Sequence, residues 1–311
     1  MVGYLAKKFV FMFVSLFLLV TTTFALMNAV PGSPLQSEKA PSAAVQKNLE
    51  AYYGLDKPIT TQYFMYLKKL AHFDLGVSMK KRFVSVNKMI SQSFKYSLRL
   101  GLVSIVTSVL AGCALGIIAA LYHRKFLDNL AMILAVIGLA IPSMVLGPLL
   151  QYLLSVKISL LPVTGLKEPL DYILPTLTLS SVSIAFIARL IRSTLIEVLS
   201  SDFIKTAKAK GLSGHIIVWK HAMRNSILPV ITYLGFLAAN VITGSIIIEQ
   251  IFAIPGMGKF FVSCITDRDY PLIMGTTVFY AVLLIASRFI ADIIYALVDP
   301  RMRTSVGRGG K

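Results

Sequence analysis

The sequence is short of charge, and above all of acidic residues. Only 14% of its 311 residues are charged, and 14 Asp and Glu stand against 31 Lys and Arg, which gives a net charge of +17. Soluble domains carry about a quarter charged residues, so this chain cannot cover a water-exposed surface of its size. An ordinary soluble enzyme is therefore excluded, and a hydrophobic content of 56% excludes a disordered scaffold.

Residues that carry catalysis or hold metals are also scarce. The two cysteines, Cys113 and Cys264, are too few for a disulfide framework or a thiolate metal site. The four histidines lack metalloprotease spacing, and no Gly-x-Ser-x-Gly element is present. Residues 253–260 are the nearest match to a phosphate-binding loop, but Ala253 stands where its first glycine should be, and Phe260 stands where its Ser or Thr should be. We expect this chain to hydrolyse no ATP and to bind no metal or cofactor.

What the sequence has in abundance is long uncharged runs. The hydrocarbon core of a bilayer is about 30 Å thick and needs about 20 apolar residues in a helix. Six runs approach this length: Phe9–Val30, Leu100–Tyr122, Asn129–Val156, Tyr172–Ala188, Ser226–Ile248 and Pro271–Val298. The predicted fold class is all-α, a polytopic membrane protein with six transmembrane helices surrounded by lipid.

The basic residues predict the orientation of these helices. Seven of them lie between Arg189 and Arg224, and more follow the last run on the same side of the membrane. The positive-inside rule makes this side cytoplasmic, so both termini are expected there. A strongly basic chain can also bind nucleic acid, but here the charges are spread over loops and no nucleic-acid partner is expected.

The runs and loops predict four parts of the chain. Residues 1–30 are the cytoplasmic N-terminus and first transmembrane helix, and 31–99 form an extracytoplasmic loop. Residues 100–298 form a five-helix core that contains the cytoplasmic loop 189–225, and 299–311 form a cytoplasmic tail. Within the outer loop, apolar residues at helical spacing predict an amphipathic helix that lies on the membrane or on neighbouring helices: Ile59, Tyr63, Tyr66, Leu67 and Leu70.

Three features of the predicted spans concern packing and charge. Gly112 and Gly116 form a Gly-x-x-x-Gly pair, which allows close helix approach in lipid. Pro142 lies midway along the third span and is expected to kink it. Arg288 and Asp292, spaced i,i+4 in the last span, are expected to pair with each other, although charges inside a membrane also indicate functional sites.

The cytoplasmic loop 189–225 has the most informative pattern. Asp202 is a candidate N-cap, Phe203–Lys210 has a helical pattern, and Gly211 is typical of a helix stop. The short side chain of Ala207 would let this helix sit deep in a groove. The helix also carries three lysines: Lys205, Lys208 and Lys210. A loop that only fixes topology explains the lysines but not a capped helix followed by a hydrophobic return segment.

The same loop resembles the inner loop of ABC importer permeases. It reads Asp202-Phe-Ile-Lys-Thr-Ala-Lys-Ala-Lys-Gly-Leu212, followed by His221-Ala-Met-Arg-Asn225 and Leu228-Pro229. Sugar permeases have Glu-Ala-Ala where this chain has Lys-Thr-Ala, and a shorter distance from the glycine to Leu-Pro. In both respects the loop resembles that of the dipeptide, oligopeptide and nickel branch of the family. Further matches follow in order along nearly the whole chain: Pro31-Gly32, Tyr53 to Pro58, Ile141-Pro142-Ser143, Ile254 to Gly258, Arg268 to Pro271, and Asp299-Pro300-Arg301.

The resemblance implies a type I importer permease of a bacterial plasma membrane that translocates oligopeptides. Its partners would be a second, homologous permease subunit, two ABC ATPases that bind ATP and Mg, and an extracytoplasmic binding protein that docks on 31–99 and Arg268–Pro271. Helix 203–210 would be the coupling helix in a cleft of one ATPase. Ala207 and Gly211 would allow close seating, with the lysines facing acceptors at the rim.

Three other functions are compatible with an apolar, basic membrane protein. A permease of the same fold could carry nickel or metal–chelator complexes, and the spans contain no histidine to bind bare metal. A secondary carrier should have an inverted repeat and broken helices in matching halves, which this sequence lacks. A membrane protein without a transport role would have no use for the ordered inner loop.

Overall fold

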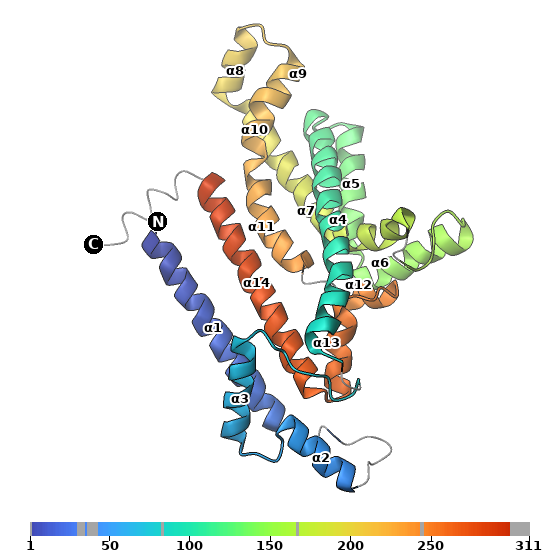
Figure 1. Cartoon of the computed structure of the whole chain (residues 1–311). Coiled ribbons are helices and arrows are strands. Elements are labelled where there is room, and N and C mark those ends of the chain that lie inside the picture. The colour runs from blue at the N-terminus through green and yellow to red at the C-terminus, as the bar shows by residue number, and fades with distance from the viewer. Residues whose placement is uncertain are drawn as a thin grey trace. The chain divides into compact units, whose positions relative to one another are not determined.

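The computed structural model describes residues 2–29, 35, 43–81, 84–165, 168–242 and 246–298. These residues are mostly helical (Figure 1), and the β pairing among them is one isolated antiparallel bridge between Val77 and Ser85. The all-α class is confirmed.

The helical elements follow one another with short connections. They are α1 (Val2–Ala29), α2 (Ala43–Tyr53), α3 (Ile59–Ala71), α4 (Val86–Leu121), α5 (Phe126–Ala140), α6 (Ser143–Leu150), the π-helical η1 (Gln151–Lys157), the 3₁₀ turn η2 (Pro169–Tyr172), α7 (Ile173–Ser200), α8 (Asp202–Ala209), α9 (Gly214–Ile216), the π-helical η3 (Ile217–Ala222), α10 (Met223–Ser226), α11 (Leu228–Ile242), α12 (Ile246–Ile251), α13 (Met257–Thr266) and α14 (Tyr270–Val298).

Fewer helices than six are long and apolar enough to cross a membrane. Four qualify in the described residues: Lys8–Ala29, Val86–Leu121, Pro169–Ser200 and Tyr270–Ile290. A fifth span results only if α5 is counted together with Ser143–Lys157, and these two segments are bent by 109°. The predicted count of six is therefore not reproduced by length and composition.

The bend lies at Pro142, where the sequence indicated a kink within one helix. Ile141 has an extended backbone with φ −98° and ψ 120°, and α6 begins immediately after the proline. The proline ring disfavours the helical conformation of the preceding residue, and its nitrogen has no hydrogen to donate. The predicted third span is consequently two helices at a steep angle.

The other predicted spans differ from the helices mainly at their ends. The fifth corresponds to α11, which has only 15 residues. The fourth does not end at Ala188, since α7 continues to Ser200. The second starts earlier, because α4 begins at Val86, inside the predicted outer loop 31–99.

The chain forms two compact units. The first unit contains residues 96–255 and the last helix from Leu283, and the second unit contains 2–95 and 256–282. Both α4 and α14 pass from one unit to the other. The predicted division at residues 30, 99 and 298 concerns the two sides of the membrane and stays a prediction.

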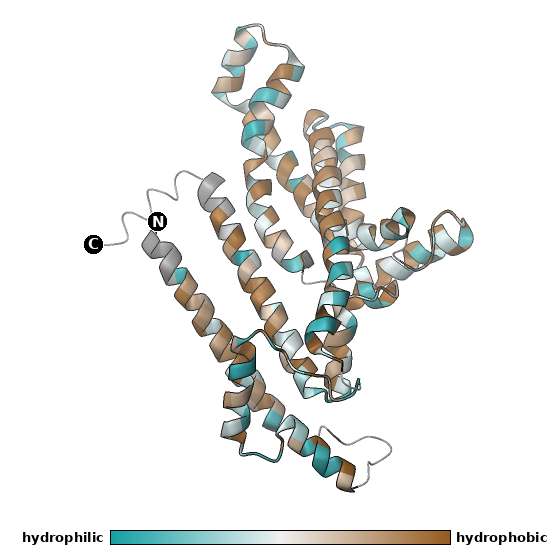
Figure 2. Cartoon of the chain, in the orientation of Figure 1, coloured by the Kyte–Doolittle hydropathy of each residue, from teal (hydrophilic) through white to brown (hydrophobic). Residues whose placement is uncertain are grey.

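In the first unit the other helices pack around α7. Ile187 and Ile191 of this helix are fully buried against Val230 and Leu237 of α11. On another side, Ala185 of α7 packs with Ala135 of α5. Figure 2 shows apolar residues along α4, α5 and α7, with hydrophilic residues at the end formed by α8 and α9.

In the second unit α3 packs on α1 and α14. Tyr63, Tyr66, Leu67 and Leu70 contact a cluster formed by Val20, Phe24, Met274 and Val278. The hydroxyl groups of Thr21 and Tyr63 are 2.6 Å apart. The helix expected after Pro58 is therefore present, and its apolar face contacts neighbouring helices, although Ile59 is exposed.

Candidate functional site

The start of α8 is one residue earlier than expected. Ser201 is its N-cap, with an extended backbone, and Asp202 occupies the first turn. The expected capping by Asp202 is therefore wrong, and the Ser201 hydroxyl donates instead to the carbonyl of Val198 at 2.5 Å. Asp202 stabilises the helix through the helix dipole and pairs with Lys205 at 2.8 Å, an exposed ion pair that contributes little.

The end of α8 is a Schellman motif centred on Gly211. The Gly211 amide donates to the carbonyl of Lys208 at 2.9 Å, and the Leu212 amide donates to that of Ala207 at 3.3 Å. Gly211 has φ +78°, which is the left-handed conformation that this motif needs and that glycine adopts most readily. The predicted stop at Gly211 thus has a specific hydrogen-bonded geometry.

The inner face of α8 packs on the chain's own core. Ile204 and Ala207 are buried in a cluster with Leu195 of α7, Ile217 of η3 and Ala120 of α4. This corrects the expected role of Ala207, because its short side chain serves packing within this chain and is not available for seating in a partner's cleft. The Cβ that a side chain would add at Gly211, in contrast, meets nothing within 4 Å.

The outer face of α8 combines apolar and basic side chains. Phe203 is 46% exposed, and Lys205, Lys208 and Lys210 are exposed as well. Trp219, in the element η3 that packs on α8, is 55% exposed. Figure 1 shows α8 and α9 together beyond the ends of α4 and α5, so this surface can be reached by a large partner.

Close helix contacts connect this surface to the apolar helices of the first unit. A Cβ built on Gly112 would lie 2.7 Å from the Cβ of Ile187, and one on Gly116 would lie 2.6 Å from the carbonyl oxygen of Ala188. The glycine pair therefore faces α7 and leaves no room for a methyl group. In addition, the Thr194 hydroxyl of α7 donates to the Ser226 carbonyl of α10 at 3.1 Å.

A buried ion pair that the sequence did not indicate joins α5 to α7. Asp128 is 2% exposed and accepts from Arg192, with Nε to Oδ1 at 2.7 Å and Nη2 to Oδ2 at 2.8 Å. The backbone amide of Arg124 donates to the same carboxylate at 2.9 Å. The sequence identifies both partners only as charges at loops or span ends, because their 64-residue separation hides the contact.

The second unit contains a further carboxylate that sequence patterns alone did not single out. Asp269 is 1% exposed and accepts from the Ser78 hydroxyl and, at 3.0 Å, from the Met79 amide. It also accepts from Leu272 in the first turn of α14, as an N-cap residue does. Asp269 thereby fixes the loop before α4 to the start of α14.

The remaining predicted residues lie apart from the α8 surface. Arg288 is exposed on α14, whereas the Asp292 side chain lies outside the described residues, so their pairing stays a prediction. Pro142 is the N-cap of α6. Across the described residues, no three His, Cys, Asp or Glu side chains gather to form a metal site.

The comparison with known proteins decides the family. Residues 112–304 match the model for the inner membrane component of binding-protein-dependent transport systems, and residues 1–99 match the model for the N-terminal part of such components. The chain belongs to this permease family. The resemblance of the inner loop is thereby confirmed, and the permease is an inner membrane protein.

Relatives match the permease over nearly its full length. It is 50% identical over 303 residues to the dipeptide transport system permease protein DppB of Bacillus subtilis, covering 97% of this chain and 98% of that protein. It is 41% identical over 305 residues to the oligopeptide transport system permease protein OppB of Haemophilus influenzae, covering 97% and 100%.

Solved structures show the fold. A chain of the inward-facing MetNI methionine ABC transporter matches with a TM-score of 0.56 and 17% identity, over 68% of this permease and 96% of that chain. A chain of an amino acid ABC transporter matches with a TM-score of 0.53 and 15% identity, over 68% and 94%. The permease therefore has the ABC importer fold that the resemblance implied.

Proposed function

We propose that this chain is one of two permease subunits of an ATP-driven importer that translocates oligopeptides. The names of its full-length relatives support peptides as the substrate class. A homologous but different subunit completes the pathway, and an extracytoplasmic binding protein delivers the peptide to residues 31–99 and Arg268–Pro271. The chain itself has no catalytic role and binds no cofactor, since the two partner ATPases hold ATP and Mg.

The observation that carries the proposal is the two-sided construction of α8. Its inner face is anchored by Ile204 and Ala207 in the core of the first unit, while its outer face presents Phe203 among lysines. An ATPase cleft with an apolar floor and an acidic rim fits this outer face. Because the inner face is packed, a displacement of α8 by the ATPase is carried to α7 and from there to α4 and α5.

ATP acts in this scheme only through a difference in affinity. The ATPase pair binds ATP more tightly in its closed state, so ATP shifts the permease toward the conformation that fits closed ATPases. The glycine contacts of α4 and the ion pair of α5 with α7 keep these helices together during the shift.

The test compares Phe203→Ser with Phe126→Ser in the complete transporter, reconstituted in proteoliposomes with its binding protein. Phe126 is 77% exposed at the start of α5 and is the matched control. Removing an aromatic residue from the centre of an interface costs more than about 1 kcal/mol, or about fivefold in affinity. We expect Phe203→Ser to weaken ATPase binding by at least about that factor and to lower uptake, with Phe126→Ser unchanged.

Two results would contradict the proposal. Unchanged ATPase affinity and uptake in Phe203→Ser would remove α8 as the contact surface. Absence of peptide uptake by the wild-type transporter, with intact ATP hydrolysis and a peptide-loaded binding protein, would remove the substrate class.

A further inference from the structure

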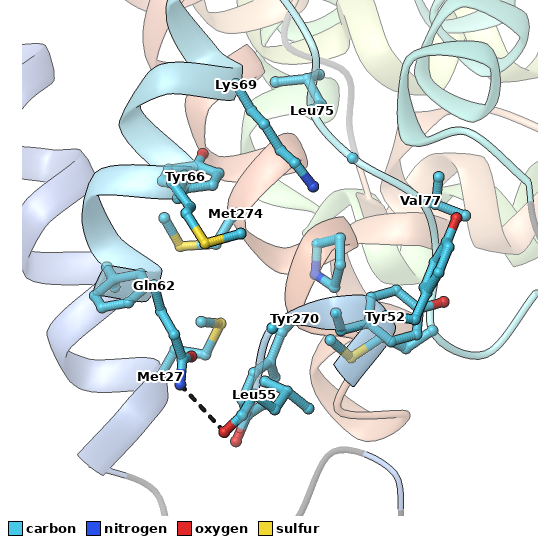
Figure 3. Close-up of a pocket in the computed structure, with 17 residues that line it drawn as sticks. Met27, Tyr52, Leu55, Gln62, Tyr66, Lys69, Leu75, Val77, Tyr270 and Met274 are labelled. Carbon is cyan, nitrogen blue, oxygen red and sulfur yellow. Dashed lines mark hydrogen bonds between the residues drawn. The ribbon is translucent and has the colours of Figure 1, made fainter. Parts of the chain in front are cut away.

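The second unit contains a cavity of about 290 Å³ next to the amphipathic helix α3 (Figure 3). Its walls come from the end of α1, the end of α2, one face of α3, the loop 75–79 and the start of α14. Among the described residues that line it, Lys69 is the one that carries a charge, and none has a carboxylate. In Figure 3 the Lys69 side chain extends from α3 toward the middle of the cavity.

Two polar side chains of the lining, Gln62 and Tyr53, are already engaged. The Gln62 amide donates to the carbonyls of Lys57 at 2.8 Å and Leu55 at 3.4 Å, which holds the connection between α2 and α3. The Tyr53 hydroxyl donates to the Ser78 carbonyl at 3.0 Å. These groups form the wall and leave no hydrogen for a ligand.

The Tyr66 hydroxyl and the Lys69 ammonium are not engaged by any described residue. The hydroxyl of Tyr66 is buried without a hydrogen-bond partner, which is costly unless a ligand or water accepts from it. Burial raises the pKa of Tyr66, so the phenol keeps its proton and acts as a donor. The Lys69 ammonium also has no partner among the described residues. The Tyr66 hydroxyl and the Lys69 ammonium can both donate to an anionic group.

The rest of the lining is apolar and adaptable. Four methionines line the cavity, together with Phe24 and several tyrosines: Met27, Met65, Met79 and Met274. Methionine side chains are flexible and polarizable, and surfaces rich in them accept ligands of different shape. The cavity thus combines one position for an anion with an apolar lining that accepts varied side chains.

We propose that this cavity is a subsite for the C-terminal end of a peptide, with the α-carboxylate on Lys69 and Tyr66 and the last side chain among the methionines. The proposal rests on the proposed function, since it assigns a contact for the substrate of the same importer. The free carboxylate is the charge common to all peptides that accepts from an ammonium and a hydroxyl, and the variable side chains match the methionine-rich lining.

The transport test uses the complete transporter with a dipeptide, Leu-Phe, and its C-terminal amide. The variants are Lys69→Gln and Tyr66→Phe, with Lys68→Gln as the control because Lys68 is the neighbouring exposed lysine of α3 and does not line the cavity. A lost hydrogen bond to a charged group lowers affinity by about tenfold. We expect Lys69→Gln to raise the half-saturating concentration of Leu-Phe by about tenfold, Tyr66→Phe by less, and Lys68→Gln not at all.

The amide and a binding measurement complete the test. Leu-Phe amide should bind the wild-type chain in nanodiscs weakly and should not distinguish Lys69→Gln from wild type. Equal behaviour of Lys69→Gln and Lys68→Gln toward Leu-Phe would overturn the subsite. If native mass spectrometry instead finds phosphatidylglycerol retained by wild type and lost from Lys69→Gln, the anion is a lipid phosphate and the peptide assignment is overturned.

The two proposals fail in different ways. A wild-type transporter that imports no peptide rejects the proposed function whatever the variants do. A wild-type transporter that imports Leu-Phe, with Lys69→Gln unchanged, rejects only the subsite.

Discussion

The buried ion pair between α5 and α7 predicts an asymmetric response to substitution. Arg192→Met leaves the carboxylate of Asp128, which is 2% exposed, with the Arg124 amide and the His123 ring, whose Nδ1 lies 3.4 Å away, as its remaining partners among the described contacts. Stranding a buried charge costs about 3–5 kcal/mol. Asp128→Asn instead leaves Arg192, whose side chain is 30% exposed and can turn to water. That loss is about 1–3 kcal/mol.

The double variant tests the origin of the effect. Asp128→Leu combined with Arg192→Met removes both charges, and replacing a buried ion pair by apolar groups is often neutral or stabilising. We therefore expect the double variant to be more stable than Arg192→Met alone. A double variant that is less destabilised than the sum of the two single variants is expected for side chains in direct contact.

The chain's own cysteines provide the assay. Cys264 is buried and Cys113 is partly buried, so a thiol-reactive fluorophore reports thermal unfolding in detergent without introduced cysteines. In large domains 1 kcal/mol corresponds to about 2–4 °C, and Arg192→Met should lower the melting temperature by about 6–20 °C. Equal shifts for both single variants, or a double variant below Arg192→Met, would refute the argument from a stranded buried carboxylate.

Two further predictions concern glycines. Gly116→Ala inserts a methyl group 2.6 Å from a backbone oxygen of α7 and should lower stability by about 1–3 kcal/mol in the same melting assay. The control Ala114→Val, at an exposed position of α4, should leave the melting temperature unchanged. Equal melting temperatures of the two variants would contradict close packing at Gly116. Gly211→Ala, at φ +78°, should lower stability by about 1 kcal/mol and speed the hydrogen exchange of the α8 amides. Gly211→Asn should have a smaller effect on both quantities. Unchanged exchange in Gly211→Ala would contradict the left-handed helix end.

Local patterns in the sequence predicted the helices well and their junctions less well. The order of turn formers and lysines around Gly211 predicted a short helix that ends there, because a left-handed helix end depends on the residue at that position itself. The sequence predicted the position of the bend at Pro142 but not its angle. A proline breaks the helix locally, whereas the angle of 109° depends on what the following helix packs against.

The faces of short helices were harder to predict. Ala207 and Phe203 are four residues apart in α8, yet the structure buries Ala207 and exposes Phe203. In a helix of 8 residues the periodic pattern is too short to fix which side is inward, so the neighbours Leu195 and Ile217 decide it. The same holds for the cavity beside α3, whose walls come from segments far apart in the chain.

The sequence by itself determined the class of this protein. Uncharged runs, an excess of basic residues and the inner-loop pattern are properties of single segments, and they suffice for an all-helical membrane permease. Only the tertiary structure decided which charges meet. Asp128 with Arg192 and Asp269 with Ser78 are separated by 64 and 191 residues, and the donors Lys69 and Tyr66 share a cavity with the start of α14. Burial and pairing depend on distance in space, which a one-dimensional pattern of residue types does not contain.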